Sequence, residues 1–136
     1  MSGGLISKKM KLEHGKMLKL LNDFVSGKKN SYEKLKDMQS RHASAEEQAI
    51  MIFYNNKKDF KLLRIILEQH EAMRGYIDEI NTNPAVAKKF GDLMKEHIML
   101  EDAKFYPMLD KDLTPTEQKE IFANFLYLFG QRVKAV

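Results

Sequence analysis

The sequence predicts an all-α protein, an antiparallel up-down-up-down four-helix bundle with an additional short C-terminal helix. Apolar residues recur every three or four positions through four long segments, which is the helical period. Only 3 prolines and 7 glycines interrupt the 136 residues. The expected loops are about two to six residues long, and helices joined by such short loops pack antiparallel. The chain is therefore expected to form a single domain (1–136), with the bundle at about 7–110 and the extra helix at about 115–130.

The first two helices follow from their apolar faces and from the residues that end them. The first is predicted from about residue 7 to residue 26, because Gly27 is a typical C-terminal stop. The second is predicted from about residue 31 to residue 54. Their apolar stripes comprise Met10, Met17, Leu21, Phe24, Leu35, Met38, Ala45, Ala49 and Ile52.

The third and fourth helices are predicted at about 60–80 and 84–109. Pro84 suits the first turn of a helix, where its missing N–H costs nothing. Thr114 and Glu117 form a capping box that opens the C-terminal helix. This helix is expected to pack across the bundle or against a second subunit. The inward residues comprise Leu63, Ile66, Met73, Ile77, Ile80, Phe90, Leu93, Leu100, Met108, Ile121, Phe122, Phe125, Leu126 and Phe129.

The composition excludes several kinds of site and partner. Without cysteine there is no thiolate zinc site or cysteine-ligated cluster, so a metal must be held by nitrogen and oxygen ligands. No apolar run approaches the roughly 20 residues of a membrane span, and no signal-peptide pattern opens the chain, so a cytoplasmic protein is expected. The net charge of +4 comes from scattered lysines without a basic stripe, and no nucleic-acid partner is expected.

The 4 histidines recur about every 28 residues, so each long helix carries one of them. Each also falls on the apolar stripe of its helix, and the four rings should point into the bundle at comparable depth. These residues are His14, His42, His70 and His97.

Two of the four histidines have a glutamate one helical turn further on. Glu46 follows His42 and Glu101 follows His97, and a spacing of four places ring and carboxylate on the same helix face. The chain thus repeats a pair of helices, the first with a lone histidine and the second with histidine and glutamate. Burying four imidazoles and two carboxylates is costly unless their charges are compensated, and divalent cations would neutralise them. The pattern predicts a pseudo-twofold metal site.

These motifs resemble the hemerythrin-like (HHE cation-binding) family over about residues 12–109. The matching motifs are Glu13-His14, His42 to Glu46-Glu47, Glu68-Gln69-His70, and His97 to Glu101-Asp102 with the ending Phe105-Tyr106-Pro107. The resemblance implies a non-haem di-iron centre inside the bundle, oxo- or hydroxo-bridged, with two bridging carboxylates and terminal histidines. It implies that the terminal ligands are His14, His42, His70 and His97, and that the bridging ligands are Glu46 and Glu101. Imidazole and carboxylate ligands suit iron, with manganese as the alternative.

The sequence departs from the oxygen-carrying hemerythrins at two places. Position 74 is arginine where their third helix has a second histidine. Asp102 is an alternate to Glu101 as the bridge, and Glu47 stands in the same relation to His42. A spacing of five residues turns a side chain well off the histidine face of an α-helix, so Glu101 is favoured unless a π-bulge intervenes.

The missing imidazole would leave openings on both metal ions. We therefore expect binding of O2, NO or reduced oxygen species for sensing, redox chemistry or iron handling, rather than bulk oxygen carriage. The alternative is a regulatory helical interaction module with a metal-free or purely structural site. In that case the aromatic face of the C-terminal helix would bind a protein partner or a second copy. Tyr54 and Tyr106 lie at the ends of the second and fourth helices. They are interpreted as core or boundary aromatics, with a place over the site as the alternative.

Overall fold

The computed structural model describes residues 4–51 and 60–134, and within these ranges it contains helices and no strand. The predicted all-α class is confirmed. The elements are α1 (Leu5–Val25), α2 (Ser31–Glu46), the π-helix η1 (Glu47–Met51), α4 (Phe60–Ile77), α5 (Pro84–Leu100), the π-helix η2 (Glu101–Phe105), α6 (Tyr106–Asp112) and α7 (Pro115–Lys134). Tyr54 lies outside the described residues.

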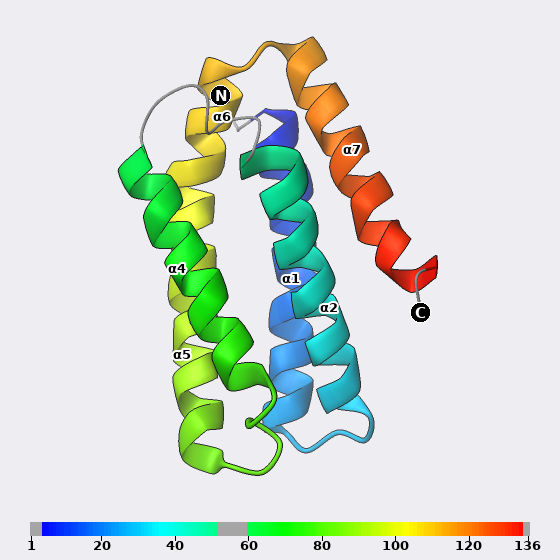
Figure 1. Cartoon of the computed structure of the whole chain (residues 1–136), viewed down its shortest axis with the longest axis vertical. Helices are drawn as coiled ribbons and strands as arrows, with labels where there is room; N and C mark the ends of the chain where they lie inside the picture. Colours follow the sequence, from blue (N-terminus) through cyan, green and yellow to red (C-terminus); the bar gives the residue numbers. More distant parts are fainter. Residues whose placement is uncertain (1–3, 52–59, 135–136) are drawn as a thin grey trace.

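The helices α1, α2, α4 and α5 lie side by side along the long axis of the molecule (Figure 1). Each contacts two of the others, in the order α1, α2, α4, α5 and back to α1. The π-helix η1 directly continues α2, and η2 and α6 directly continue α5. The fourth predicted helix is therefore a continuous helical run that contains one π-helical segment.

Local sequence signals set the observed helix ends. Gly27 adopts φ +78°, the left-handed conformation that favours glycine after a helix. The Asn83 side chain caps α5 by accepting hydrogen bonds from the backbone of Ala85 and Val86. At α7, the Thr114 amide donates to Glu117 Oε1 at 2.9 Å, and the Glu117 amide donates to Thr114 Oγ1 at 3.1 Å. This is the reciprocal pattern of the predicted capping box.

Two separate apolar clusters fill the interior, and each histidine lies close to the point where its helix passes from one cluster to the other. One cluster includes Met10 of α1 and Ile66 of α4. The other includes Met17 of α1 and Met73 of α4. On α1 and α4 the chain thus passes from the first cluster through a histidine to the second, and on α2 and α5 it passes in the opposite sense. The clusters therefore shield a polar layer at mid-length from both sides.

The C-terminal helix packs onto the same chain, against α1, α2, α6 and η1 (Figure 1). Phe125 is fully buried, and Phe122 and Phe129 pack against the first cluster. Side chains near this helix also hold the start of α1, since Asp110 accepts from the Gly4 amide at 2.9 Å and Gln118 from the Leu5 amide at 3.0 Å. The aromatic face is thus used within the chain. None of the described helices has the length and apolar character needed to cross a membrane.

Candidate metal centre

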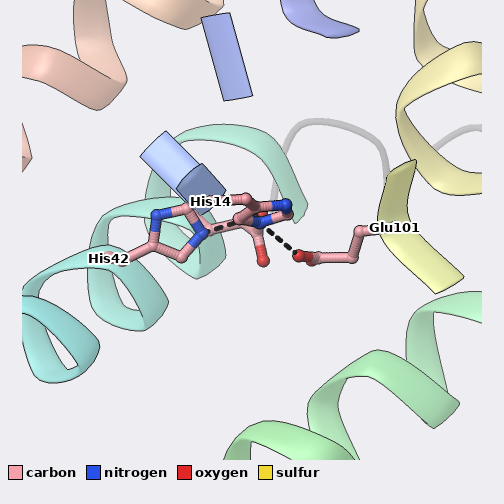
Figure 2. A group of neighbouring side chains, drawn as sticks. His14, His42 and Glu101 are labelled. Carbon is pink, nitrogen blue, oxygen red and sulfur yellow. Dashed lines mark ion pairs between the residues drawn. The ribbon is translucent and has the colours of Figure 1, made fainter. Parts of the chain in front are cut away.

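The structure brings the six predicted ligands together in one buried layer. They form two groups whose candidate ligand atoms all lie within 4.8 Å of one another in each group. We define position A as the group His14, His42, Glu46 and Glu101, and position B as the group Glu46, His70, His97 and Glu101. All six side chains are at most 1% exposed. Figure 2 shows His14, His42 and Glu101 pointing toward one another from separate elements.

Each glutamate touches one histidine of each position. Glu101 Oε1 is 3.1 Å from Nε2 of both His14 and His97. Glu46 Oε1 is 3.1 Å from Nε2 of His70, and Glu46 Oε2 is 3.6 Å from Nε2 of His42. The two carboxylates therefore stand between the two pairs of imidazoles, which is where bridging ligands would be placed.

The two alternate carboxylates occupy a different place, outside both groups. Asp102 accepts a hydrogen bond from Nδ1 of His14 at 2.9 Å, and Glu47 accepts one from Nδ1 of His70 at 2.6 Å. Such bonds orient the ring so that Nε2 faces the interior, and they make the imidazole a better ligand. Among the described residues, Glu101 belongs to both candidate groups and Asp102 to neither. The π-helix begins at Glu101 and does not separate it from His97.

Gln69 and Arg74 complete the surroundings of position B. The Gln69 side-chain oxygen accepts from Nδ1 of His97 at 2.7 Å. The Arg74 guanidinium donates to Glu47 at 2.9 Å and to Glu71 at 2.8 Å, and its side chain is 37% exposed. Arginine at position 74 therefore supports the site indirectly, through the carboxylate that holds His70.

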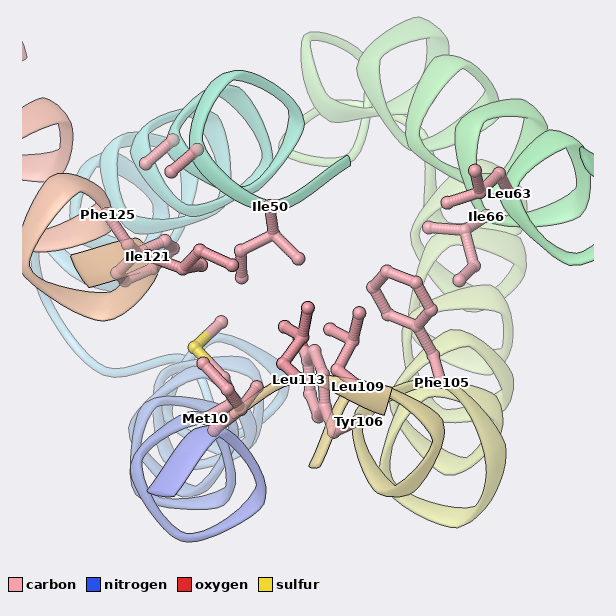
Figure 3. Close-up of a cluster of buried hydrophobic side chains, with 13 residues drawn as sticks. Met10, Ile50, Leu63, Ile66, Phe105, Tyr106, Leu109, Leu113, Ile121 and Phe125 are labelled. Atoms are coloured by element: carbon pink, nitrogen blue, oxygen red, sulfur yellow. The ribbon is translucent and has the colours of Figure 1, made fainter. Parts of the chain in front are cut away.

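The core placement predicted for Tyr106 is confirmed, and its hydroxyl also lies within the site. The ring is fully buried in the first apolar cluster (Figure 3). Its hydroxyl donates to Glu46 and lies 3.0 Å from Glu101 Oε1 and 3.3 Å from Nε2 of His14. The Tyr106 amide bonds the Glu101 carbonyl across the π-turn, and this winding brings a residue five positions on back to the same face.

The buried charges compensate one another. Burial lowers the pKa of His14, but Asp102 and the two glutamates outweigh it and raise the pKa to about 10. Burial likewise lowers the pKa of His70, and Glu46 and Glu47 raise it to about 10. Burial and the neighbouring carboxylates raise the pKa of Tyr106 well above its usual range, so the phenol is protonated.

The buried donor groups suit metal binding. Neither ring nitrogen of His42 makes a hydrogen bond with any described residue, and Glu101 Oε2 is also without one. Nε2 of His70 and Nε2 of His97 face each other at 3.2 Å. Unpaired buried donors and acceptors of this kind are costly, and metal coordination would satisfy them. The donor set of imidazole nitrogen and carboxylate oxygen suits a divalent transition-metal ion.

The stability of the metal-free chain should depend on pH in both directions. The positive charges of His14 and His70 stabilise the fold fully below their ordinary pKa of 6.5, and this contribution is lost as the pH rises toward about 10. Contacts with His70 and Arg74 outweigh burial and lower the pKa of Glu47 below 4.5, so its contribution is lost in acid. We expect the melting temperature to be highest between about pH 5 and pH 7. A melting temperature that rises steadily from pH 7 to pH 10 would contradict this.

Removing the Tyr106 hydroxyl should weaken the metal-free chain more than the loaded one. In Tyr106→Phe, two buried carboxylates lose a donor, which costs about 1–3 kcal/mol of unfolding free energy. A bound cation would replace that donor, so we expect a smaller loss in zinc-loaded protein. Urea unfolding of both forms measures the difference. Tyr32→Phe is the control, because the Tyr32 hydroxyl donates to the Ile77 carbonyl, away from the site. Its removal should lower the free energy of unfolding equally in both forms. If Tyr106→Phe lost the same free energy of unfolding in the metal-free and zinc-loaded forms, a bound cation would not replace the hydroxyl as a partner of the glutamates.

The comparison with family models agrees with this geometry. Residues 5–109 match the model of the hemerythrin HHE cation binding domain. This range begins with α1 and ends in α6, and it contains all six residues of positions A and B. No curated protein and no solved structure matches the chain significantly.

Proposed function

The chain belongs to the hemerythrin HHE cation-binding family, and from this premise we propose that it is a non-haem di-iron protein. It would bind O2, NO or reduced oxygen species for sensing, redox chemistry or iron handling. The observation that carries the proposal is the sharing of Glu46 and Glu101 between two histidine pairs. The four long helices then form the predicted antiparallel up-down-up-down bundle, with the two ions at its centre.

The ligand count supports binding of small molecules at both ions. Each position offers two imidazoles and a share of two carboxylates. Iron accepts up to six ligands, so each ion would keep open places. Arg74 supplies no further ligand, because its guanidinium is engaged by Glu47 and Glu71. Openings on both ions favour reactive or sensory chemistry over reversible carriage of oxygen, for which one open place on one ion suffices.

The residues around the site would control what reaches it and how protons are held. A bound iron pair would supply the redox-active centre for small oxygen and nitrogen ligands. The two apolar clusters exclude bulk water from both ends of the layer. The protonated Tyr106 hydroxyl, in contact with both glutamates, holds a proton at the edge of position A. We therefore expect the site to admit small neutral molecules more readily than ions.

The test is the electronic absorption spectrum of iron-loaded protein before and after exposure to O2, NO and peroxide. We expect new bands with at least one of these ligands, and their loss in the double variant His42→Ala/His97→Ala. Loaded protein whose spectrum responds to none of the three would contradict the proposed function.

A second measurement separates this function from oxygen carriage. The wild-type chain should not bind O2 reversibly over many cycles, because both positions are open to further reaction. Arg74→His would offer a fifth imidazole one turn after His70 and is expected to lengthen the lifetime of bound O2. A wild-type chain that already binds and releases O2 unchanged would contradict this part of the proposal.

A further inference from the structure

The two halves of the site are related by an internal repeat of about 55 residues. It pairs Glu46 with Glu101 and Glu47 with Asp102. The hydrogen bonds follow the same repeat, because Glu47 holds His70 and Asp102 holds His14. Each of these carboxylates thus reaches across to the lone histidine of the other half.

In three of the four histidines, Nδ1 donates to a side-chain oxygen, and His42 is the exception among the described residues. Gln69, the residue before His70, accepts from Nδ1 of His97 on the adjacent helix α5. By the same relation, we expect Glu13, the residue before His14, to serve His42 on α2. Nδ1 of His42 and Oε1 of Glu13 are both buried, and neither has a hydrogen-bond partner in the described part of the chain.

We propose that Glu13 is the positioning residue of His42 in the loaded site, and that position A therefore binds its cation before position B. The inference rests on the proposed function. Both imidazoles of position A would then donate to carboxylates, namely Asp102 and Glu13. Donation to a carboxylate makes an imidazole a stronger ligand, and such outer contacts change metal affinity by about 10- to 100-fold.

The histidines of position B donate from Nδ1 to weaker acceptors. The acceptor for His97 is the neutral amide of Gln69, and the charge of Glu47 is paired with Arg74. The repeat places Leu18 where Arg74 stands in the other half, so no arginine faces Asp102 in the same way. Lys16 contacts Glu13 at 3.4 Å, but its side chain is 69% exposed and water screens its charge. The net electrostatic difference favours a cation at position A.

The experiment exchanges the two acceptors without changing the net charge. Metal-free full-length protein is titrated with Zn²⁺, and the imidazole nitrogens are followed by NMR while native mass spectrometry counts the bound ions. In wild type, the signals of His14 and His42 should change with the first equivalent, and those of His70 and His97 with the second. Glu13→Gln should weaken the first step by about tenfold or more.

The double variant Glu13→Gln/Gln69→Glu should reverse or erase the order of filling. Gln69→Glu alone should tighten the second step, and it tests the inference even if Glu13→Gln does not fold. Glu68→Gln is the matched control, because it removes a carboxylate from an exposed neighbour of Gln69 and should change neither step. Simultaneous change of all four histidines in wild type, or an order unaffected by the exchange, would overturn the inference. A wild-type chain that binds no ion at all would instead overturn the proposed function.

Discussion

Replacing Glu46 with alanine is expected to remove both metal ions from the chain. Glu46 belongs to both groups, and its two oxygens contact one histidine of each. Each position then loses one of its shared carboxylates, and the negative charge between two cations is halved. We expect metal affinity to fall by more than 100-fold at both positions, measured as ions retained per chain after dialysis.

The contrast with a terminal ligand makes this prediction specific. His42 belongs to position A alone, so His42→Ala should weaken that position and leave an ion at position B. A Glu46→Ala protein that keeps one ion at wild-type affinity would show that Glu46 serves one position only. The melting temperatures of the metal-free variants establish that both proteins remain folded.

The second large effect is expected at Phe125, where Phe125→Ala should lower the free energy of unfolding by about 3–5 kcal/mol. The side chain is fully buried in the first apolar cluster (Figure 3). Its ring meets that of His42 edge-on, with the ring centroids 5.6 Å apart. Its loss would open a cavity between α7 and the site. Leu126→Ala is the control, because that neighbouring residue is 50% exposed and should change stability by about 0.5 kcal/mol or less. Chemical denaturation measures both, and equal losses would contradict the packing described.

This packing changes what truncation of the C-terminal helix is expected to do. If the helix served only association, removal of residues 113–136 would leave the site intact. Because Phe125 contacts His42 and Gln118 holds the start of α1, truncation should destabilise the bundle and weaken position A. The sequence left open whether this helix packs on its own chain, since its aromatic face suits either arrangement.

The ligand layer could be predicted because it depends on α-helical spacing alone. One histidine per helix and a glutamate four residues after two of them are visible in the sequence, and α-helical geometry brings them together. The hydrogen bonds from the Nδ1 atoms of these histidines could not be predicted in the same way. Glu47 and Asp102 follow ligands directly, so their partners lie on other helices. Only the three-dimensional arrangement shows which histidine each one holds.

Tyr106 lies in the apolar core as predicted, but the sequence did not show its contacts with the glutamates, because these depend on a change of winding. Five residues after Glu101, an α-helix would turn the side chain away from the ligand face. The π-helix η2 restores it to that face and places the hydroxyl against both glutamates. A second π-helix, η1, follows Glu46 at the equivalent place in the repeat. Period-based reasoning assumes a constant number of residues per turn and therefore fails at such sites.

The most direct measurement of the shared-carboxylate site is an anomalous difference map from crystals of iron-loaded protein. We predict two peaks in the buried layer, one beside His14 and His42 and the other beside His70 and His97, with Glu46 and Glu101 against both. A single peak, or two peaks that do not share these glutamates, would contradict the two-position site on which the proposed function depends.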